Sequence, residues 1–475
     1  NLSDKTKEKL KQPFHKIICI EKLDVVYFLP RTDIYDGNLK FSAERNDEAS
    51  FRRAVQFRQN DSVQPDRFLK DIHLIVGILP RCGVERNQFI EISFRIFARH
   101  YAVHLLELFH QIGFDVQTAG RIDDQDVCLF RLDRRAVGKI SLLTAVFYFS
   151  AYFYRFFTLG YAHDSLLIDQ SIDMTWQIQL GRFLQPVYLL FRGDIAVPYL
   201  IGLLAYLYLA AAICLVVDLL SLSSTLSISL VCMALCANTT LTRLHGTFHM
   251  MADSYMLALL LSVLCVFVAV RLRHGVWLAP VLLCGSAALY QSYVPVATVF
   301  FLILLVHHAL DGFSFRALLL RGVRYLGVLI AGLVFYSLCL RVVYALTGQT
   351  AADSYNGMAG MGNFEGYSIV DLLRRAYLFP FEKMARPQTA FPRAAAAAYG
   401  LLLLFSLAAV CYLLHARRIA LPCAALTFVF LLLVPFGADF IYLLSKGMVH
   451  DLMIYAFFFC AVLPISLADR LRPPA

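Results

Sequence analysis

The feature that most constrains this fold is a series of long apolar segments in the second two thirds of the chain. About ten stretches approach the roughly 20 apolar residues that a helix needs to cross a bilayer. They lie near 140–159, 196–217, 222–240, 254–270, 276–290, 294–309, 323–346, 396–414, 419–436 and 448–467. Hydrophobic residues make up 59% of the whole chain, which is too many for an ordinary soluble protein. We therefore predict an α-helical polytopic membrane protein.

The acidic residues divide the chain into two unequal parts. Residues 1–138 contain 20 of the 34 aspartates and glutamates. A basic cluster, RLDRRAVGKI, directly precedes the first apolar segment. We therefore predict a soluble α/β region over 1–138 and a polytopic membrane domain over 139–475.

The first of these regions has the pattern of a mixed α/β fold. DIHLIVGIL is typical of a buried strand, and FRIFARHYAVHLLELFHQIGFDV predicts an amphipathic helix that ends at a glycine before another strand. This order resembles the C-terminal end of a class I methyltransferase fold. The region lacks a glycine-rich cofactor loop, so it is either a remnant of such a fold or an unassigned α/β domain.

The net charge of +9 follows the expected topology of the spans. Basic residues cluster in the short connections at 271–275, 315–324, 415–418 and 469–474. Such connections face the cytoplasm in membrane proteins, and this pattern explains the charge better than a nucleic-acid surface does. It places the N-terminal region in the cytoplasm.

The unusual polar residues of the membrane part are predicted to collect on the opposite, external side. These residues are Asp164, Asp169, Asp173, Arg182, Arg243, His245, His249, Asp253, Gln291, Asp439, Lys446, His450 and Asp451. Ionisable groups at the rim of a span are costly and usually serve a polar site. We therefore expect polar binding or chemistry at that face.

The first external segment, GYAHDSLLIDQSIDMTWQIQLGRF, concentrates these acids directly after a span. Asp169 and Asp173 are four residues apart and would share one face of a helix. The segment is either an amphipathic helix on the membrane surface with solvated acids, or part of an active site. Asp164 differs from the other two acids because it lies nearest the end of the span.

A second polar group follows the third apolar segment. His245, His249 and Asp253 are spaced by four residues, which would place them on one helical face. Two histidines and a carboxylate at this spacing can bind a metal ion, but without a stronger signature we favour substrate hydrogen bonding or a structural polar network. A divalent metal cofactor is possible, and no metal ligand is assigned.

Two further positions extend this external group. Gln291 and Tyr293 lie between two apolar segments and form either a substrate contact or an ordinary turn. Lys446 is expected to contact a lipid phosphate, with Asp439 or Asp451 as its neutralising acid, or else to extend to the bilayer surface. The loop at 347–395 contains the amphipathic stretch IVDLLRRAYLF and either covers this group or merely connects two spans.

These motifs, taken in order, resemble a known membrane family. HDSLLIDQ followed by W and GRF, then HGTFHMMADSYMLALLL, LYQSYVPVATVFFLILL and GMVHDLMIYAFFF, are similar to the type II O-antigen (serotype-converting) glucosyltransferases of bacteriophages and bacteria. This family belongs to the C-type glycosyltransferase superfamily. The resemblance covers residues 139–470.

The resemblance implies a function and roles for particular residues. It implies that a hexose, glucose, passes with inversion from a polyprenyl-phosphate donor to O-antigen of lipopolysaccharide or another cell-surface glycan, at the periplasmic face of a bacterial inner membrane. It gives Asp164 as general base with Asp169 as replacement, and Arg182 and Lys446 as phosphate contacts. The expected sugar or lipid contacts are His249, Asp253, Gln291 and Tyr293.

The alternative function is a transporter or flippase for lipid-linked sugars. Such a protein also has many spans, but it is expected to show internal repeats, interrupted helices and charges near the middle of the bilayer. The sequence has no clear repeat, and its charges gather at one rim. The pattern therefore favours a transferase.

Overall fold

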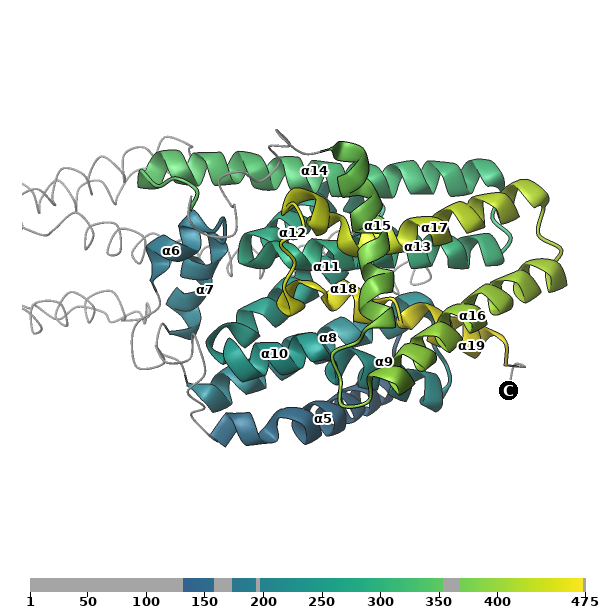
Figure 1. Ribbon diagram of the computed structural model, residues 1–475, viewed down its shortest axis with the longest axis horizontal. Helices are drawn as coiled ribbons and strands as arrows, with labels where there is room; N and C mark the ends of the chain where they lie inside the picture. Colours follow the sequence, from purple (N-terminus) through teal and green to yellow (C-terminus); the bar gives the residue numbers. More distant parts are fainter. Residues whose placement is uncertain (1–130, 158–172, 194–196, 353–367, 473–475) are drawn as a thin grey trace, which may run out of the picture. The chain divides into compact units, whose positions relative to one another are not determined.

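The computed structural model describes residues 131–157, 173–193, 197–352 and 368–472. They belong to one compact unit, and every element within these ranges is helical (Figure 1). Of the α/β region expected over 1–138, residues 1–130 lie outside the described residues, so that region stays a prediction. Its last residues belong to the start of α5.

The described chain forms fifteen α-helices and three short 3-10 helices. The first half contains α5 (Arg134–Phe157), α6 (Met174–Gln179), α7 (Leu184–Arg192), α8 (Pro198–Leu220), α9 (Thr225–Cys236), α10 (Thr239–Thr247), η3 (His249–Met251), α11 (Ala252–Arg271) and α12 (Gly275–Tyr290). The second half contains η4 (Gln291–Tyr293), α13 (Val294–Leu310), α14 (Phe315–Thr347), α15 (Ile369–Ala385), α16 (Pro392–Ala416), α17 (Leu421–Leu444), η6 (Asp451–Met453), α18 (Tyr455–Phe459) and α19 (Val462–Arg470).

The membrane character is confirmed, with fewer long spans than the ten apolar segments suggest. Seven described helices are long and apolar enough to cross a bilayer, or eight if the bent pair α9 and α10 forms one span. Two expected spans fall within one continuous helical stretch, Gly275–Leu310. The last expected span, near 448–467, is divided among η6, α18 and α19. Composition identified apolar segments, but it did not show where the helices bend.

The helical stretch Gly275–Leu310 is interrupted at η4. Gln291 and Phe301 contact Tyr336 and Tyr325 of α14, respectively. Chain positions that increase along α13 therefore meet positions that decrease along α14, so these two helices are antiparallel. The Tyr290 backbone is extended, with φ −161° and ψ 110°, which breaks the helix at the turn.

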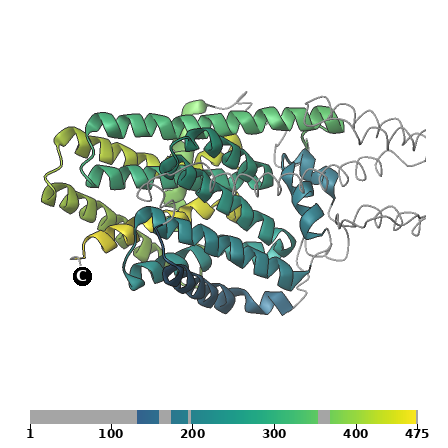
Figure 2. The ribbon, with the colours of Figure 1, turned by 180° about the vertical axis from the view of Figure 1, so that it is seen from behind.

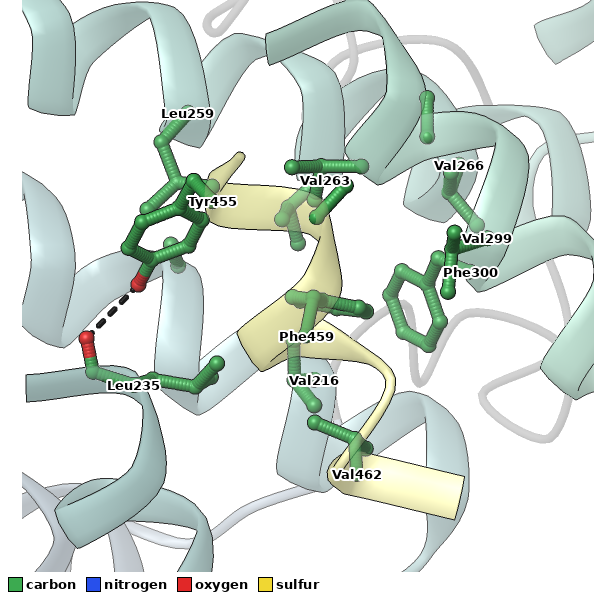
Figure 3. Close-up of a cluster of buried hydrophobic side chains, with 14 of the residues drawn as sticks. Val216, Leu235, Leu259, Val263, Val266, Val299, Phe300, Tyr455, Phe459 and Val462 are labelled. Carbon is green, nitrogen blue, oxygen red and sulfur yellow. Dashed lines mark hydrogen bonds between the residues drawn. The ribbon is translucent and has the colours of Figure 1, made fainter. Parts of the chain in front are cut away.

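The core consists of tightly packed apolar side chains around α11 and α13. Most residues of both helices are buried. Short helix α18 inserts Tyr455 and Phe459 between the longer helices, where the Phe459 ring lies 5.3 Å from that of Phe300 (Figure 3). The hydroxyl of Tyr455 donates to the carbonyl oxygen of Leu235 at 2.8 Å, so its polar atom is satisfied inside the core.

One end of the helix bundle is held by arginines and is called the basic end. Arg271 on α11 pairs with the buried carboxylate of Asp218 on α8, with 2.9 Å between nitrogen and oxygen. Asp311, after α13, pairs with both Arg417 and Arg470. The three arginines belong to three of the basic connections that the charge pattern places on one side of the membrane.

The opposite end is called the polar end, and it carries the short helices α6 and α7 (Figures 1 and 2). Helix α14 runs from the basic end toward the polar end. On its basic side Arg324 donates to the carbonyl of Ala269, and on its polar side Tyr336 lies beside Gln291. Helix α15 runs across the direction of α14 (Figure 1). The described polar residues that were expected on one face lie toward this end.

We predict that Gly332 is required for close packing of α14 on α12. A Cβ at this position would lie 2.7 Å from Leu283 Cδ2 and 2.9 Å from its Cβ. Gly332→Ala should therefore cost about 1–3 kcal/mol and lower the thermal unfolding midpoint in detergent. Gly327→Ala on the same helix has no atom within 4 Å of its Cβ and should not lower it. Equal effects of the two substitutions would contradict this packing.

Candidate active site

Helix α7 presents three polar side chains on one face. Gln185, Tyr188 and Arg192 are spaced by three and four residues, so they project in nearly the same direction. Pro186 lies in the first turn, where its missing N–H costs no helical hydrogen bond. The face packs on α11 and α12: the side-chain amide of Gln185 donates to Ser254 Oγ at 2.8 Å and to the Leu289 carbonyl at 3.1 Å.

Asp253, in the first turn of α11, is the centre of a buried ion pair. Its Oδ2 lies 3.3 Å from Arg192 Nε, and the two side chains are 0% and 1% exposed. Tyr188 donates its hydroxyl to the same oxygen at 2.9 Å, and the backbone N–H of Ser254 donates to Oδ1. Burial, and then the neighbouring Asp253 charge, raise the pKa of Tyr188 well above its ordinary value. Asp253 is thus fully engaged with protein groups.

The expected continuous face of His245, His249 and Asp253 is wrong. The helix breaks at Phe248, with φ −126° and ψ 34°, so the three residues lie in α10, η3 and α11. His245 and His249 still meet, with 3.1 Å between their Nδ1 atoms, but Asp253 binds Arg192 instead.

The two histidines form a closed hydrogen-bond chain. His249 Nε2 contacts the Pro198 carbonyl at 3.0 Å, and His245 Nε2 contacts the Tyr148 hydroxyl at 2.8 Å. With both rings neutral, one assignment satisfies every contact: Tyr148 donates to His245, His245 donates to His249, and His249 donates to the carbonyl. All four ring nitrogens then have protein partners, which makes this chain structural.

Arg182 lies directly before α7 and rests on stacked aromatic rings. Its guanidinium carbon is 4.9 Å from the ring centroid of Tyr290 and 5.8 Å from that of Tyr255. These two rings stack on each other at 4.0 Å. A planar guanidinium over an aromatic face is held in a defined orientation.

Gln291 and Tyr336 hold the turn that precedes Arg182. Gln291 Nε2 donates to the Leu180 carbonyl at 2.8 Å and lies 2.9 Å from the Tyr336 hydroxyl, which donates to the Gly181 carbonyl at 3.0 Å. Gly181 has φ +75°, a conformation that favours glycine. Gln291 therefore fixes the backbone beside Arg182, a role that the sequence did not indicate.

Tyr293 is buried next to the same aromatic row. Its ring lies 5.7 Å from Tyr290 and 5.5 Å from Tyr455. Its hydroxyl is buried and has no hydrogen-bond partner among the described residues. The row of Tyr290, Tyr293 and Tyr455 thus links the Arg182 region to α18.

Lys446 and Asp451 occupy the turn between α17 and α18. Lys446 has a left-handed backbone, with φ 53°. The ion pairs of Asp451 come from other elements: Lys383 Nζ on α15 lies 3.3 Å from Oδ1, and Arg243 Nε on α10 lies 3.5 Å from Oδ2. The neutralising acid proposed for Lys446 is therefore already paired with two other cations.

The predicted bases, Asp164 and Asp169, lie outside the described residues. Their neighbour Asp173 caps α6, and its Oδ1 accepts from the backbone N–H groups of Thr175 and Trp176 at 2.9 and 3.2 Å. The expected helical face shared by Asp169 and Asp173 is therefore wrong for Asp173, which precedes the helix as its N-cap.

Sequence reasoning missed several residues of this region. Tyr188, Arg192 and Gln185 share one face of α7, and their spacing was the signal that could have found them. Lys383 had no such signal, because its partner Asp451 is 68 residues away in the chain. Within the described ranges, no group of three or more His, Cys, Asp or Glu side chains is arranged to hold a metal ion.

The comparison with protein families decides the class of this membrane protein. The family model described as glucosyl transferase GtrII matches residues 154–464. The chain belongs to the GtrII glucosyl transferase family. No curated protein and no solved structure matches it significantly. Membership of the GtrII family implies an enzyme that transfers a glucosyl group, and the match spans α7, α11, α15 and η6, which carry the polar groups described above.

We predict that Arg192 and Asp253 stabilise the GtrII transferase only as a pair. Removal of one partner leaves a buried charge, so Arg192→Met and Asp253→Asn should each cost about 3–5 kcal/mol. The free energy of unfolding lost in the double variant should be smaller than the sum of the losses in the two single variants. The cycle is measured by thermal unfolding in detergent, with the exposed Arg316→Gln as control, expected to change stability by about 0–0.5 kcal/mol. Additive effects would show that the pair does not interact.

We predict that Gly181 cannot carry a side chain without moving Arg182. An alanine Cβ would lie 2.5 Å from Tyr336 Oη and 2.8 Å from Gln291 Nε2, at a φ that L-residues rarely adopt. Gly181→Ala should lower both the unfolding midpoint and the rate of glucosyl transfer. Gly193→Ala shares a positive φ of +95° but meets no atom within 4 Å, so it should show only the smaller backbone penalty. Unchanged transfer by Gly181→Ala would contradict the proposed fixation.

Proposed function

We propose that this GtrII transferase moves glucose from a polyprenyl-phosphate donor to O-antigen or another cell-surface glycan, with inversion at the anomeric carbon. The observation that carries the proposal is the family match together with the position of Arg182, which rests on Tyr290 directly after the acidic segment. A lipid-anchored donor requires its phosphate to be recognised near the surface of the bilayer. The polar end offers cations at the ends of membrane helices, which suits that requirement.

The chemistry needs a base and a cation on opposite sides of the anomeric carbon. The base acts on the acceptor hydroxyl, and the cation acts on the leaving phosphate. A sugar hydroxyl is a poor nucleophile, so a positioned carboxylate must accept its proton as the new bond forms. The leaving phosphate gains negative charge and is stabilised by a fixed cation. We assign the base to Asp164, with Asp169 as the less favoured choice, and one phosphate contact to Arg182.

The remaining expected contacts take more limited roles in this proposal. Asp253 and His249 are bound by protein groups, so they support the site from beneath and do not face the sugar. Gln291 holds the turn at Gly181, and Tyr293 belongs to the aromatic row. Lys446 stays a candidate phosphate contact at the polar end.

We further propose that the polar end faces the periplasm of a bacterial inner membrane. The support is the cluster of arginines at the basic end, including Arg271, Arg417 and Arg470, since basic connections remain in the cytoplasm. Residues 1–138 would then form a cytoplasmic region separate from the membrane domain of 139–475.

We predict that Asp164→Asn abolishes transfer while the protein still folds. Loss of the base should reduce the rate by about 10²–10⁴-fold. The assay supplies membranes from expressing cells with labelled polyprenyl-phosphate glucose and lipopolysaccharide, and measures label in the glycan. Asp169→Asn is the matched control and should retain most of the activity. If Asp164→Asn transferred at the wild-type rate and Asp169→Asn did not, the assignment of the base would be reversed.

A further inference from the structure

A second group of charges at the polar end has no role in the chemistry derived so far. It consists of Arg243 on α10, Lys383 on α15 and Asp451 on η6, and is called the Asp451 cluster. Asp451 receives both cations, at 3.5 Å from Arg243 Nε and 3.3 Å from Lys383 Nζ. Its backbone is fixed independently, because Thr240 Oγ1 donates to the Asp451 carbonyl at 2.7 Å.

The geometry of the Asp451 cluster leaves positive charge available. Two cations share one carboxylate, and both distances exceed the 2.7–2.9 Å of a well-formed charged hydrogen bond. The Arg243 side chain is 56% exposed and that of Lys383 is 27% exposed. By contrast, the Arg192 and Asp253 side chains are almost fully buried. An anion can therefore reach Arg243 and Lys383, whereas it cannot reach Arg192.

A buried carboxyl group near Lys383 is a second feature of this place. Asp439 is 2% exposed and lies where α17 bends, with φ −133° and ψ 22°, four residues after Pro435. Lys383 is the charged group that acts on it electrostatically. Its Oδ2 has no hydrogen-bond partner among the described residues. Lys383 is thus held by its ion pair with Asp451, and the buried carboxyl group of α17 lies in its electrostatic environment.

Helix α15 gives the cluster the character of a lipid–water boundary. Leu372, Ala376 and Pro380 are buried, and α15, which packs against α17, runs across the direction of α14 (Figure 1). Its exposed side chains include apolar and basic residues together: Ile369, Val370, Leu373, Arg374, Arg375 and Leu378. Helices with such mixed surfaces lie at bilayer surfaces, where lipid chains meet anionic groups. A ligand with an apolar tail and an anionic head fits this setting.

We propose that Lys383 and Arg243 bind the phosphate of the lipid-linked sugar donor, and that Asp451 occupies these cations when the donor is absent. This inference rests on the proposed function and adds to it two donor contacts from α10 and α15. The row of Tyr290, Tyr293 and Tyr455 runs from Arg182 to α18, and η6, which carries Asp451, contacts both η4 and α18. The Asp451 cluster therefore neighbours the Arg182 region.

We predict that neutralising Lys383 weakens recognition of the donor. Lys383→Gln should raise the KM for polyprenyl-phosphate glucose by about tenfold or more, because a charged hydrogen bond to the phosphate is lost. Lys383→Arg should restore most of the affinity, and Arg243→Gln should show a smaller rise. Arg316→Gln removes an exposed charge at the start of α14, away from the cluster, and should leave the KM unchanged. An unchanged KM in Lys383→Gln would overturn the proposal.

A binding measurement separates this inference from the proposed function. The purified full-length chain in detergent is titrated with sugar-free polyprenyl phosphate, with phosphatidylglycerol and with inorganic phosphate, and the unfolding midpoint is recorded. Lys383→Gln should lose the stabilisation by polyprenyl phosphate, even if wild-type protein fails to transfer glucose. Equal loss of the response to phosphatidylglycerol would overturn the donor assignment in favour of a general anionic-lipid site. Equal stabilisation of wild type by inorganic phosphate would overturn the lipid requirement.

Asp451→Asn distinguishes a binding role from a structural one. If Asp451 competes with the phosphate for the two cations, its neutralisation should maintain or increase the affinity for polyprenyl phosphate. If the three charges served only to join α10, α15 and η6, the affinity should fall in Asp451→Asn as it does in Lys383→Gln. That second result would overturn the proposal.

Discussion

The buried pair of Arg192 and Asp253 is the interaction on which the polar end depends. Moving two charges out of water costs several kcal/mol each, so the pair persists only with close geometry and further hydrogen bonds. Tyr188, Ser254 and the Met250 carbonyl, which accepts from Arg192 at 3.1 Å, supply those bonds. The pair fixes α7 to the start of α11. The segment just before α7, with Arg182, is therefore fixed to the most buried part of the bundle.

Burial separates the polar groups of this GtrII transferase into two kinds. The histidine chain and Asp253 are enclosed, and their hydrogen-bonding atoms are used within the protein. Arg182 lies at the edge of this interior, and Arg243 and Lys383 are exposed to different degrees. Only the second kind can exchange a protein partner for a substrate phosphate. The enclosed groups hold the helix ends in place, and the exposed cations are the ones that we propose bind the donor phosphate.

The sequence predicted the membrane class from its apolar lengths and basic connections, and the family from a series of short motifs. The described polar residues lie toward one end, as the charge pattern predicted. Sequence reasoning failed where helices break. The spacing of His245, His249 and Asp253 suggests one helical face, but the bend at Phe248 turns Asp253 toward Arg192. Pairs between distant segments, such as Lys383 with Asp451, depend on the packing of α15 across the bundle and have no local pattern. The roles of Gln291 and Asp173 were missed because a hydrogen bond to a backbone group depends on local geometry that residue type does not show.

The interrupted helices also bear on the choice between a transferase and a transporter. Breaks occur at Phe248, at η4 and at Asp439, and interrupted helices are a feature of many transporters. Here the breaks lie beside the Arg182 region and the Asp451 cluster, at the polar end, while the basic end is joined by ion pairs of Asp218 and Asp311. Alternating access requires both ends to open in turn around a central site. Non-helical backbone in a membrane protein is tolerated where it lines a polar site. In this bundle the irregular backbone and the exposed cations lie at the same end, which suits a reaction at one membrane face better than transport across it.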